Sequence, residues 1–216
     1  MYLSRLQLNS HSRLIWQDVV DRPYKLHQLV MKAFPDGVTR AGANVLHRLE
    51  IDVGNAILLV QSEIKPNWDY IHHDLLPPAS PFDLLPNPAI REINDLELEE
   101  GRILQFRLTA NPTIKKVRRD KNGKRLNSNR VPLKREEKQL VWLQNKGKLH
   151  GFIIHYAQIS HMQKQSSKKH NLTLFTVQFD GHLQIIDACK FSHAMKTGIG
   201  PAKAFGCGLL SIALAQ

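Results

Sequence analysis

Cysteine is scarce in this chain of 216 residues, and long apolar runs are absent. The two cysteines, Cys189 and Cys207, have neither the spacing of a metal site nor the pattern of a disulfide framework. No stretch approaches the roughly 18 consecutive apolar residues of a membrane-spanning helix, and the first residues lack an apolar run followed by a cleavage site. The sequence therefore predicts a cytoplasmic protein that does not contact a membrane.

Acidic residues are fewer than basic residues, and the excess of basic residues lies in one half of the chain. The whole chain has 19 Asp and Glu against 30 Lys and Arg, which gives a net charge of +11. Residues 1–94 contain 9 basic and 10 acidic residues, whereas residues 95–216 contain 21 and 9. A strongly basic surface favours a polyanionic partner. We therefore expect a polyanion to bind mainly to the second half.

Metal-binding and nucleotide-binding motifs are missing as well. His72, His73 and Asp74 are adjacent, but neighbouring histidines flanked by prolines do not form a known ligand spacing. The chain also lacks the lysine motif of a P-loop and the full context of a dinucleotide fingerprint. The sequence thus predicts no metal site and no small-molecule cofactor. Four other histidines are expected to be structural or to lie near the polyanion: His155, His161, His182 and His193.

Glycine is concentrated near the C-terminus, where four of the 12 glycines lie within residues 198–208. They are Gly198, Gly200, Gly206 and Gly208, and Lys203 lies among them. Glycine allows positive φ and close approach, and exposed N–H groups in such a segment form an anion-binding concavity. The pattern predicts a loop that contacts the phosphates of a polymer. A simple connection between a helix and a strand is the alternative.

The apolar patterns predict the same order of elements in both halves of the chain. The first half has expected strands over 2–8, 45–53, 56–64 and within 89–96, and a helix that begins near Pro23. The second half has expected strands over 102–110, 152–159, 172–179, 182–186 and 209–214, helices over 134–148 and 188–197, and a turn at 180–181. This order predicts an α+β protein with two tandem ferredoxin-like (βαββαβ, RRM-like) domains, 1–94 and 95–216.

Two basic segments lie in the second half. Residues 115–135 contain ten Lys and Arg, with Asp120 as the only acid, and residues 160–170 are expected to form the basic tip of a β-hairpin. No aromatic residue interrupts the first segment, so we expect it to pair with phosphates rather than to stack on bases. Solvated loops are the alternative for both. The candidate RNA-binding side chains are Lys115, Lys116, Arg118, Arg119, Lys164, Lys168 and Lys169.

His27 is the candidate catalytic residue. It follows Tyr24 by three residues on the predicted first helix, so the two side chains are neighbours outside the apolar stripe. A histidine acts as a general acid or base near neutral pH, and a phenol beside it can orient a reacting oxygen. Lys32 could stabilise charge on a phosphate, although an ideal helix turns it about 140° away from His27. Periodicity alone leaves open a surface histidine with no role.

Five blocks of the sequence resemble the CasE family of CRISPR-associated endoribonucleases, the RNA-processing subunits of the type I-E Cascade complex. The resemblance runs in the same order from residue 1 to about residue 214. The Arg-Leu-x-Ala-Asn-Pro block and the glycine-rich loop are its most specific parts. The five blocks are MYLSRLQL at the N-terminus, residues 23–27, residues 107–112, residues 130–133 and GIGPAKAFGCGLLS.

The resemblance implies metal-independent cleavage of CRISPR repeat RNA at the base of a hairpin. In this family the 2′-hydroxyl attacks the adjacent phosphate, which gives a 2′,3′-cyclic phosphate and a 5′-hydroxyl, and the product stays bound in Cascade with the other subunits. His27 matches the family's catalytic histidine, Tyr24 its partner tyrosine, and Lys32 a basic position that some members use. The loop over 198–208 matches the RNA-contacting loop. The basic segment over 115–130 is longer and more charged than the family pattern.

Two other functions are compatible with these residues. One is a subunit that binds an RNA hairpin in the same complex without cleaving it, and the other is a general basic chaperone of structured RNA. The presence of both Tyr24 and His27 favours the nuclease.

Overall fold

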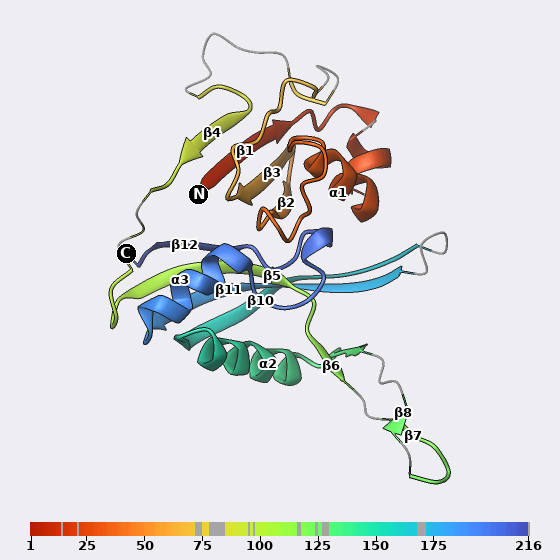
Figure 1. Ribbon diagram of the computed structural model, residues 1–216, viewed down its shortest axis with the longest axis vertical. Helices are drawn as coiled ribbons and strands as arrows, with labels where there is room; N and C mark the ends of the chain where they lie inside the picture. Colours follow the sequence, from red (N-terminus) through yellow and green to blue (C-terminus); the bar gives the residue numbers. More distant parts are fainter. Residues whose placement is uncertain are drawn as a thin grey trace.

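The first half of the chain forms a four-stranded antiparallel sheet in the computed structural model (Figure 1). The structure describes all residues except 14, 21, 72–74, 78–84, 95, 97, 116–117, 124, 127–129, 168–171 and 216. The sheet has the order β2-β3-β1-β4, and η1, a π-helix, and α1 connect β1 to β2. The expected strands and first helix are thus confirmed. Their bounds are β1 (Tyr2–Leu8), η1 (Ile15–Val20), α1 (Pro23–Met31), β2 (Leu46–Asp52), β3 (Asn55–Ser62) and β4 (Ala89–Glu92).

The core of this half follows the sequence periodicity. Alternate residues of β1 and β3 are buried, and Leu6 lies opposite Leu58 in the register of the two strands. Pro23 opens α1, where its missing N–H leaves no intrahelical bond unmade. Leu26 and Val30 of α1 pack into the same core, and the hydroxyl of Tyr70 donates a hydrogen bond to the carbonyl oxygen of Leu29. One side of α1 is therefore fixed against the sheet.

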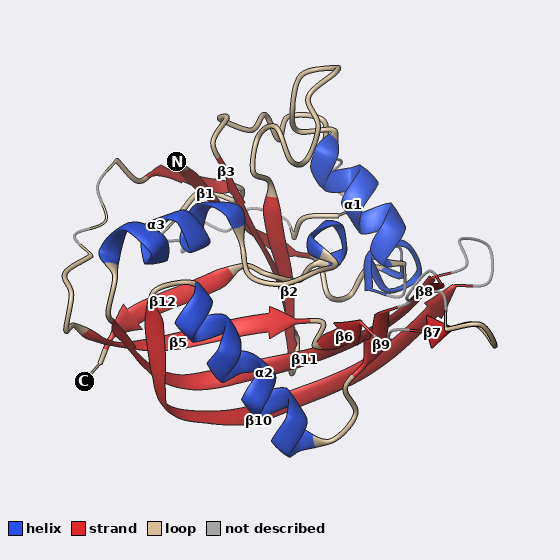
Figure 2. Cartoon of the chain, turned by 60° about the horizontal axis from the view of Figure 1, so that its bottom comes forward, coloured by secondary structure: helices blue, strands red, loops and turns tan. Residues whose placement is uncertain are grey.

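The second half forms another four-stranded antiparallel sheet, in the order β10-β11-β5-β12. Both α-helices of this half pack on one face of it (Figure 2). β10 and β11, which follow one another between the two helices, form one long hairpin that extends beyond the rest of the sheet (Figure 1). The elements are β5 (Ile103–Ala110), α2 (Glu136–Leu149), β10 (Phe152–Ser167), β11 (Leu172–Ile185), α3 (Ala188–Thr197) and β12 (Leu210–Leu214).

The core of the second half lies between this sheet and the two helices. Leu108 of β5 is fully buried between Phe179 and Leu210, its partners on the two neighbouring strands. Leu143 of α2 and Phe191 of α3 are also fully buried in this core. In the part of the chain that the structure describes, no helix is long and apolar enough to cross a membrane.

One sequence expectation in this half is wrong. Residues 180–181 do not form a turn before a separate strand, because β11 continues through them to Ile185. Tyr156 lies next to an irregularity in the pairing of β10 with β11. A Cβ atom on Gly181 would come within 2.0 Å of the carbonyl oxygen of Tyr156. The glycine therefore allows the two strands to approach closely. In the sequence, a glycine required for this reason looks the same as a glycine required by a turn.

The basic segment after β5 forms small sheets rather than an irregular loop. β6 (Thr113–Lys115) pairs with β9 (Arg130–Pro132), and β7 (Arg118–Arg119) pairs with β8 (Arg125–Leu126). A turn lies between β7 and β8, where Gly123 has a φ of +76°. Figure 1 shows this segment projecting away from both large sheets.

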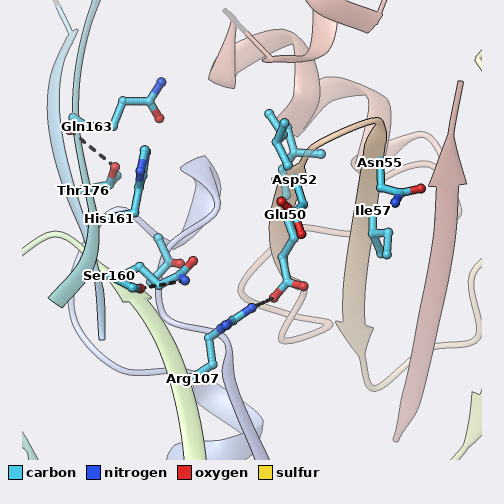
Figure 3. A pocket seen from close by; sticks show the side chains of 13 residues that line it. Glu50, Asp52, Asn55, Ile57, Arg107, Ser160, His161, Gln163 and Thr176 are labelled. Atoms are coloured by element: carbon cyan, nitrogen blue, oxygen red, sulfur yellow. Dashed lines mark hydrogen bonds and ion pairs between the residues drawn. The ribbon is translucent and has the colours of Figure 1, made fainter. Parts of the chain in front are cut away.

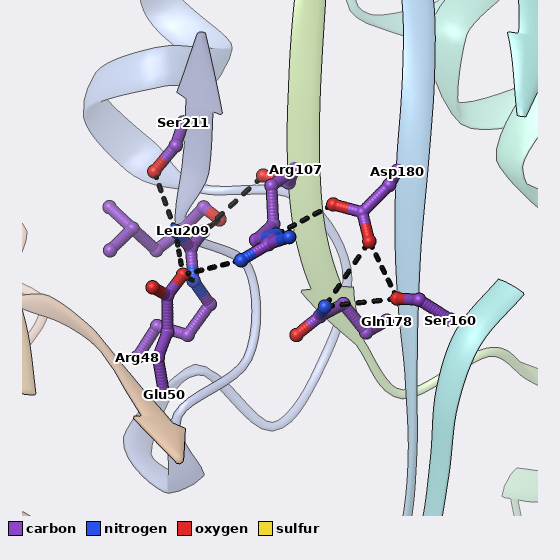
Figure 4. A network of polar contacts seen from close by, with 8 residues as sticks. All are labelled: Arg48, Glu50, Arg107, Ser160, Gln178, Asp180, Leu209 and Ser211. Atoms are coloured by element: carbon purple, nitrogen blue, oxygen red, sulfur yellow. Dashed lines mark hydrogen bonds and ion pairs between the residues drawn. The ribbon is translucent and has the colours of Figure 1, made fainter. Parts of the chain in front are cut away.

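A buried polar network joins the two halves (Figure 4). The Arg48 guanidinium donates to the carbonyl oxygens of Leu209 and Arg107, at 3.1 and 3.3 Å, and to the hydroxyl of Ser211 at 2.8 Å. Its Nη2 also lies 2.7 Å from Glu50. The end of the glycine-rich segment is thereby held against β2 of the first half.

Candidate functional site

The candidate catalytic pair lies on the first helix, as the sequence predicts. Tyr24 and His27 are one turn apart on α1, on the side that does not enter the core. The Tyr24 side chain is 40% exposed. His27 is half-buried, and its Nδ1 is a buried atom without a hydrogen-bond partner. Burial and then the positive charge of Arg40 lower the pKa of His27 below its ordinary value, which favours the neutral imidazole that a general base requires.

A second histidine faces His27 from β2. The rings of His27 and His47 are stacked, with 6.5 Å between centroids and 21° between planes. His47 is 1% exposed, and both of its ring nitrogens lack a hydrogen-bond partner. Burial, and then the charges of His27 and Arg40, lower its pKa to about 3. His47 is therefore neutral near pH 7.

Arg40 is the cation that acts on both histidines. Its Nη1 donates to the carbonyl oxygen of Val45 at 3.1 Å, which holds the guanidinium near the start of β2. Burial lowers the pKa of Arg40 itself, but a guanidinium stays protonated in proteins. A partly desolvated positive charge therefore lies beside the two imidazoles.

The glycine-rich segment brings a second cation from the other half of the chain. Its short 3₁₀-helix η2 (Lys203–Phe205) lies against both α1 and β2. The Lys203 Nζ donates to the carbonyl oxygen of Thr197 at 2.6 Å. Burial, followed by the charges of Arg40 and Lys146, lowers the pKa of Lys203. Residues about 170 positions apart in the sequence thus meet at one place.

The four glycines of this segment have different surroundings. All four have positive φ, between +81° and +93°. Gly198 and Gly208 are buried, and Cβ atoms there would come within 2.7 Å of Leu46 and 3.0 Å of Ile199. Gly200 and Gly206 are half-buried, against Trp142 and His47. Packing and backbone conformation account for the first two, whereas phosphate contact stays a prediction at the latter two.

Lys32 does not join this cluster. It lies just beyond the last residue of α1 and lines a different hollow of about 550 Å³ with Lys65, Asp69 and Tyr70. The cation whose charge acts on His27 is Arg40 rather than Lys32, and the role of Lys32 at a phosphate stays a prediction. The angle of about 140° between positions 27 and 32 on an ideal helix indicates that the Lys32 side chain points away from His27.

The other candidate RNA-binding residues lie on the two projecting segments. Lys115 of β6 and Lys164 of β10 are exposed. Arg118 and Arg119 form β7, of which the backbone alone is described. Lys116, Lys168 and Lys169 lie outside the described residues, as does the sequence 72–74. In the part of the chain that is described, no group of three or more His, Cys, Asp or Glu could hold a metal ion.

A separate cleft of about 680 Å³ lies between the two halves (Figure 3). Glu50 and Asp52 line one wall, and Ser160, His161 and Gln163 of β10 line the other. Arg107 crosses its floor, where its Nε lies 2.6 Å from Asp180 and its Nη1 3.5 Å from Glu50. Since Arg107 is already paired with two carboxylates and the wall with Glu50 and Asp52 is acidic, this cleft is not suited to phosphate.

Sequence reasoning missed Arg40 and His47. Arg40 lies in a segment without periodicity, between α1 and β2. His47 and Arg48 are consecutive buried residues of one strand, which breaks the alternation of a half-buried strand. The only signal for His47 is a polar residue within an otherwise apolar stretch, next to the buried first residues of β2.

Comparison with known proteins identifies the relatives of this fold. A profile of the family described as "CRISPR associated protein" matches residues 1–213. The chain is 29% identical to the CRISPR-associated endoribonuclease Cse3 of Thermus thermophilus, over 99% of this chain and 100% of that protein. It is 40% identical to the CRISPR system Cascade subunit CasE of Escherichia coli, over 55% of this chain and 62% of that protein.

A solved structure supports the same relationship over the full length. The structure of Thermus thermophilus Cse3 bound to an RNA representing a pre-cleavage complex is similar, with a TM-score of 0.79 and 26% identity, over 98% of each chain. The chain therefore belongs to the Cse3/CasE family of CRISPR-associated proteins.

Proposed function

We propose that this protein is an endoribonuclease that binds CRISPR repeat RNA, cleaves it without a metal ion and remains bound to the product as a subunit of Cascade. The relatives support this proposal through their names: one is a CRISPR-associated endoribonuclease and the other a Cascade subunit. In this proposal residues 1–94 and 95–216 are two ferredoxin-like domains, since both sheets have the strand order of that fold.

One observation carries the proposal: Arg40, His27, His47 and Lys203 come together from both halves of the chain. Within the described part of the chain, the charges that shift the pKa values of His27, His47 and Lys203 are all positive. Cations that are partly desolvated and lack a neighbouring carboxylate attract an anion. A phosphate between α1 and η2 fits this charge and would contact both halves.

The proposed reaction is an intramolecular transphosphorylation. The 2′-oxygen loses its proton and attacks the adjacent phosphorus, the bond to the 5′-oxygen breaks, and that oxygen gains a proton. The products are a 2′,3′-cyclic phosphate and a 5′-hydroxyl. His27 transfers a proton through Nε2, because its Nδ1 is buried, and Tyr24 orients the reacting oxygens from the same side of α1. Arg40 and Lys203 stabilise the charge on the phosphate as it forms the transition state.

RNA binding extends beyond this cluster to the basic projections of the second half. Exposed Lys115 and Lys164 lie on β6 and on the long hairpin, respectively. Lysines at such positions pair with backbone phosphates and add affinity without reading sequence. The duplex part of a repeat hairpin would then lie along the second half, with the cleaved phosphate at the boundary between the halves.

The test is cleavage of the cognate repeat RNA by stoichiometric protein in EDTA, with analysis of the product ends. We expect a cyclic phosphate and a 5′-hydroxyl. His27→Ala should reduce the single-turnover rate by about 10²- to 10⁴-fold while RNA affinity is retained, and His11→Ala, which changes an exposed histidine outside α1, should cleave normally. Intact RNA with the unaltered protein would refute the nuclease and leave the non-catalytic RNA-binding subunit.

A pair of lysine and arginine variants decides which cation acts. Arg40→Ala should reduce the cleavage rate more than Lys32→Ala does, because Arg40 acts on the His27 imidazole and Lys32 lines a different hollow. The reverse order of the two rates would restore the role that the family resemblance gives to Lys32.

A further inference from the structure

Two facing histidine rings contain three buried nitrogens that have no hydrogen-bond partner. They are Nδ1 of His27 and both Nδ1 and Nε2 of His47. Buried polar atoms in proteins nearly always have a partner, either a protein group or an ordered water. The local excess of unpartnered nitrogens between α1 and β2 therefore requires an explanation.

The spacing of the two rings fits one water molecule. The ring centroids are 6.5 Å apart, which is too far for a direct hydrogen bond between the rings. The nitrogens lie at the ring edges and can be closer together than the centroids, and two hydrogen bonds of about 2.8 Å in series span up to about 5.6 Å between two nitrogens. A single water between the rings can therefore bond to one nitrogen of each.

We propose that His47 is a positioning residue that holds the His27 imidazole in one orientation, with Nδ1 turned toward β2, through a bridging water between the two rings. The inference rests on the proposed function, because it assigns His47 a role in the reaction of His27. It assigns no contact between His47 and the RNA.

The surroundings of His47 keep it suited to this role. His27 faces it from α1 and Arg40 acts on it from the segment before β2, and neither can neutralise a charged imidazole. Burial and the charges of His27 and Arg40 keep its pKa at about 3. A neutral imidazole has one donor and one acceptor, so it can bond to a water in either direction.

The glycine-rich segment covers the pair. A Cβ atom on Gly206 would lie 3.8 Å from Nε2 of His47, so the backbone of the segment packs directly on that ring. A water held between the rings would be separated from bulk solvent on that side. With Nδ1 of His27 engaged, Nε2 is the nitrogen that remains for the substrate.

The variant His47→Phe keeps an aromatic ring in the core and removes both nitrogens. We expect the single-turnover cleavage rate to fall about tenfold or more while the Kd for repeat RNA is unchanged, because no contact with RNA is lost. His47→Gln, which has one donor and one acceptor, should recover part of the rate. His11→Phe, at an exposed position, is the matched control. An unchanged cleavage rate in His47→Phe would overturn the proposal.

NMR of the imidazole rings tests the same inference without RNA. In the unaltered protein the nuclear Overhauser contacts of the His27 ring protons should fit one ring orientation, and in His47→Phe they should fit a mixture of two, with His27→Gln used for assignment. A mixture already present in the unaltered protein would refute the positioning role, even where His47→Phe folds poorly. Because this measurement does not depend on cleavage, failure of the proposed nuclease and failure of the His47 inference give different results.

Discussion

Replacing Arg48 with alanine removes the main polar connection between the two halves of the chain. The Arg48 side chain is 3% exposed, and it donates to Leu209, Arg107 and Ser211 of the second half and to Glu50 of its own strand. The substitution removes this donor from two carbonyl oxygens, from the Ser211 hydroxyl and from Glu50, and also leaves a cavity.

The size of the effect follows from the burial of the pair. Removing one partner of a buried ion pair costs about 3–5 kcal/mol, because the remaining charge stays desolvated and unpaired. The Glu50 side chain is 26% exposed and keeps one weaker partner, Arg107 at 3.5 Å, so we expect a value at the lower end, about 3 kcal/mol or less. Such a loss is a large fraction of the about 5–15 kcal/mol that stabilises a typical domain.

Urea unfolding monitored by tryptophan fluorescence measures this change. Trp68 reports on the first half and Trp142 on the second. The matched control is Arg107→Ala in the same network: the Arg107 side chain is 43% exposed, and Asp180 keeps Ser160 and Gln178 as donors. The control should lose only about 1 kcal/mol. Equal losses for the two variants would show that the buried guanidinium does not hold the halves together.

Three further predictions concern the sheet, the histidine pair and the hairpin. Gly181→Ala should lower the free energy of unfolding by more than about 2 kcal/mol, because its Cβ would meet the Tyr156 carbonyl oxygen. Gly54→Ala, at a position with positive φ but open space, should lower it by only about 1 kcal/mol. Urea unfolding compares the two variants, and equal losses would contradict the packing argument. The folded-state pKa of His47, about 3, lies below its ordinary 6.5, so the unfolded chain binds the proton first. The free energy of unfolding should therefore fall as pH decreases from about 6.5 toward 3. His47→Phe should reduce the slope of the free energy of unfolding against pH, and an unchanged slope would refute the pKa shift. Lys164→Ala should reduce the salt dependence of RNA affinity by about 0.7 to 0.9 in log–log slope, while Lys138→Ala, exposed on α2, should not; identical slopes would show that the hairpin does not contact phosphate.

The sequence by itself determined the order of the elements. Burial of one face gives local patterns: alternation in residues 2–8 and 103–110, and the apolar stripe of α1. Such patterns can be recognised in the sequence without knowledge of the tertiary contacts. The family resemblance also pointed to His27 and Tyr24 on one side of α1. The uneven charge placed the basic projections in the second half, since net charge depends on composition alone.

Only the tertiary structure decided which groups surround His27. Arg40, His47 and Lys203 lie in three separate segments, and contact between η2 and α1 depends on how the two halves pack. His47 and Arg48 are both buried because the start of β2 has the first core on one side and the second half on the other, a condition that no local period encodes. The same applies to Gly181, where close approach of β10 rather than a turn requires glycine. Contacts between distant segments therefore determine the chemistry of the site on a framework that local patterns already predict.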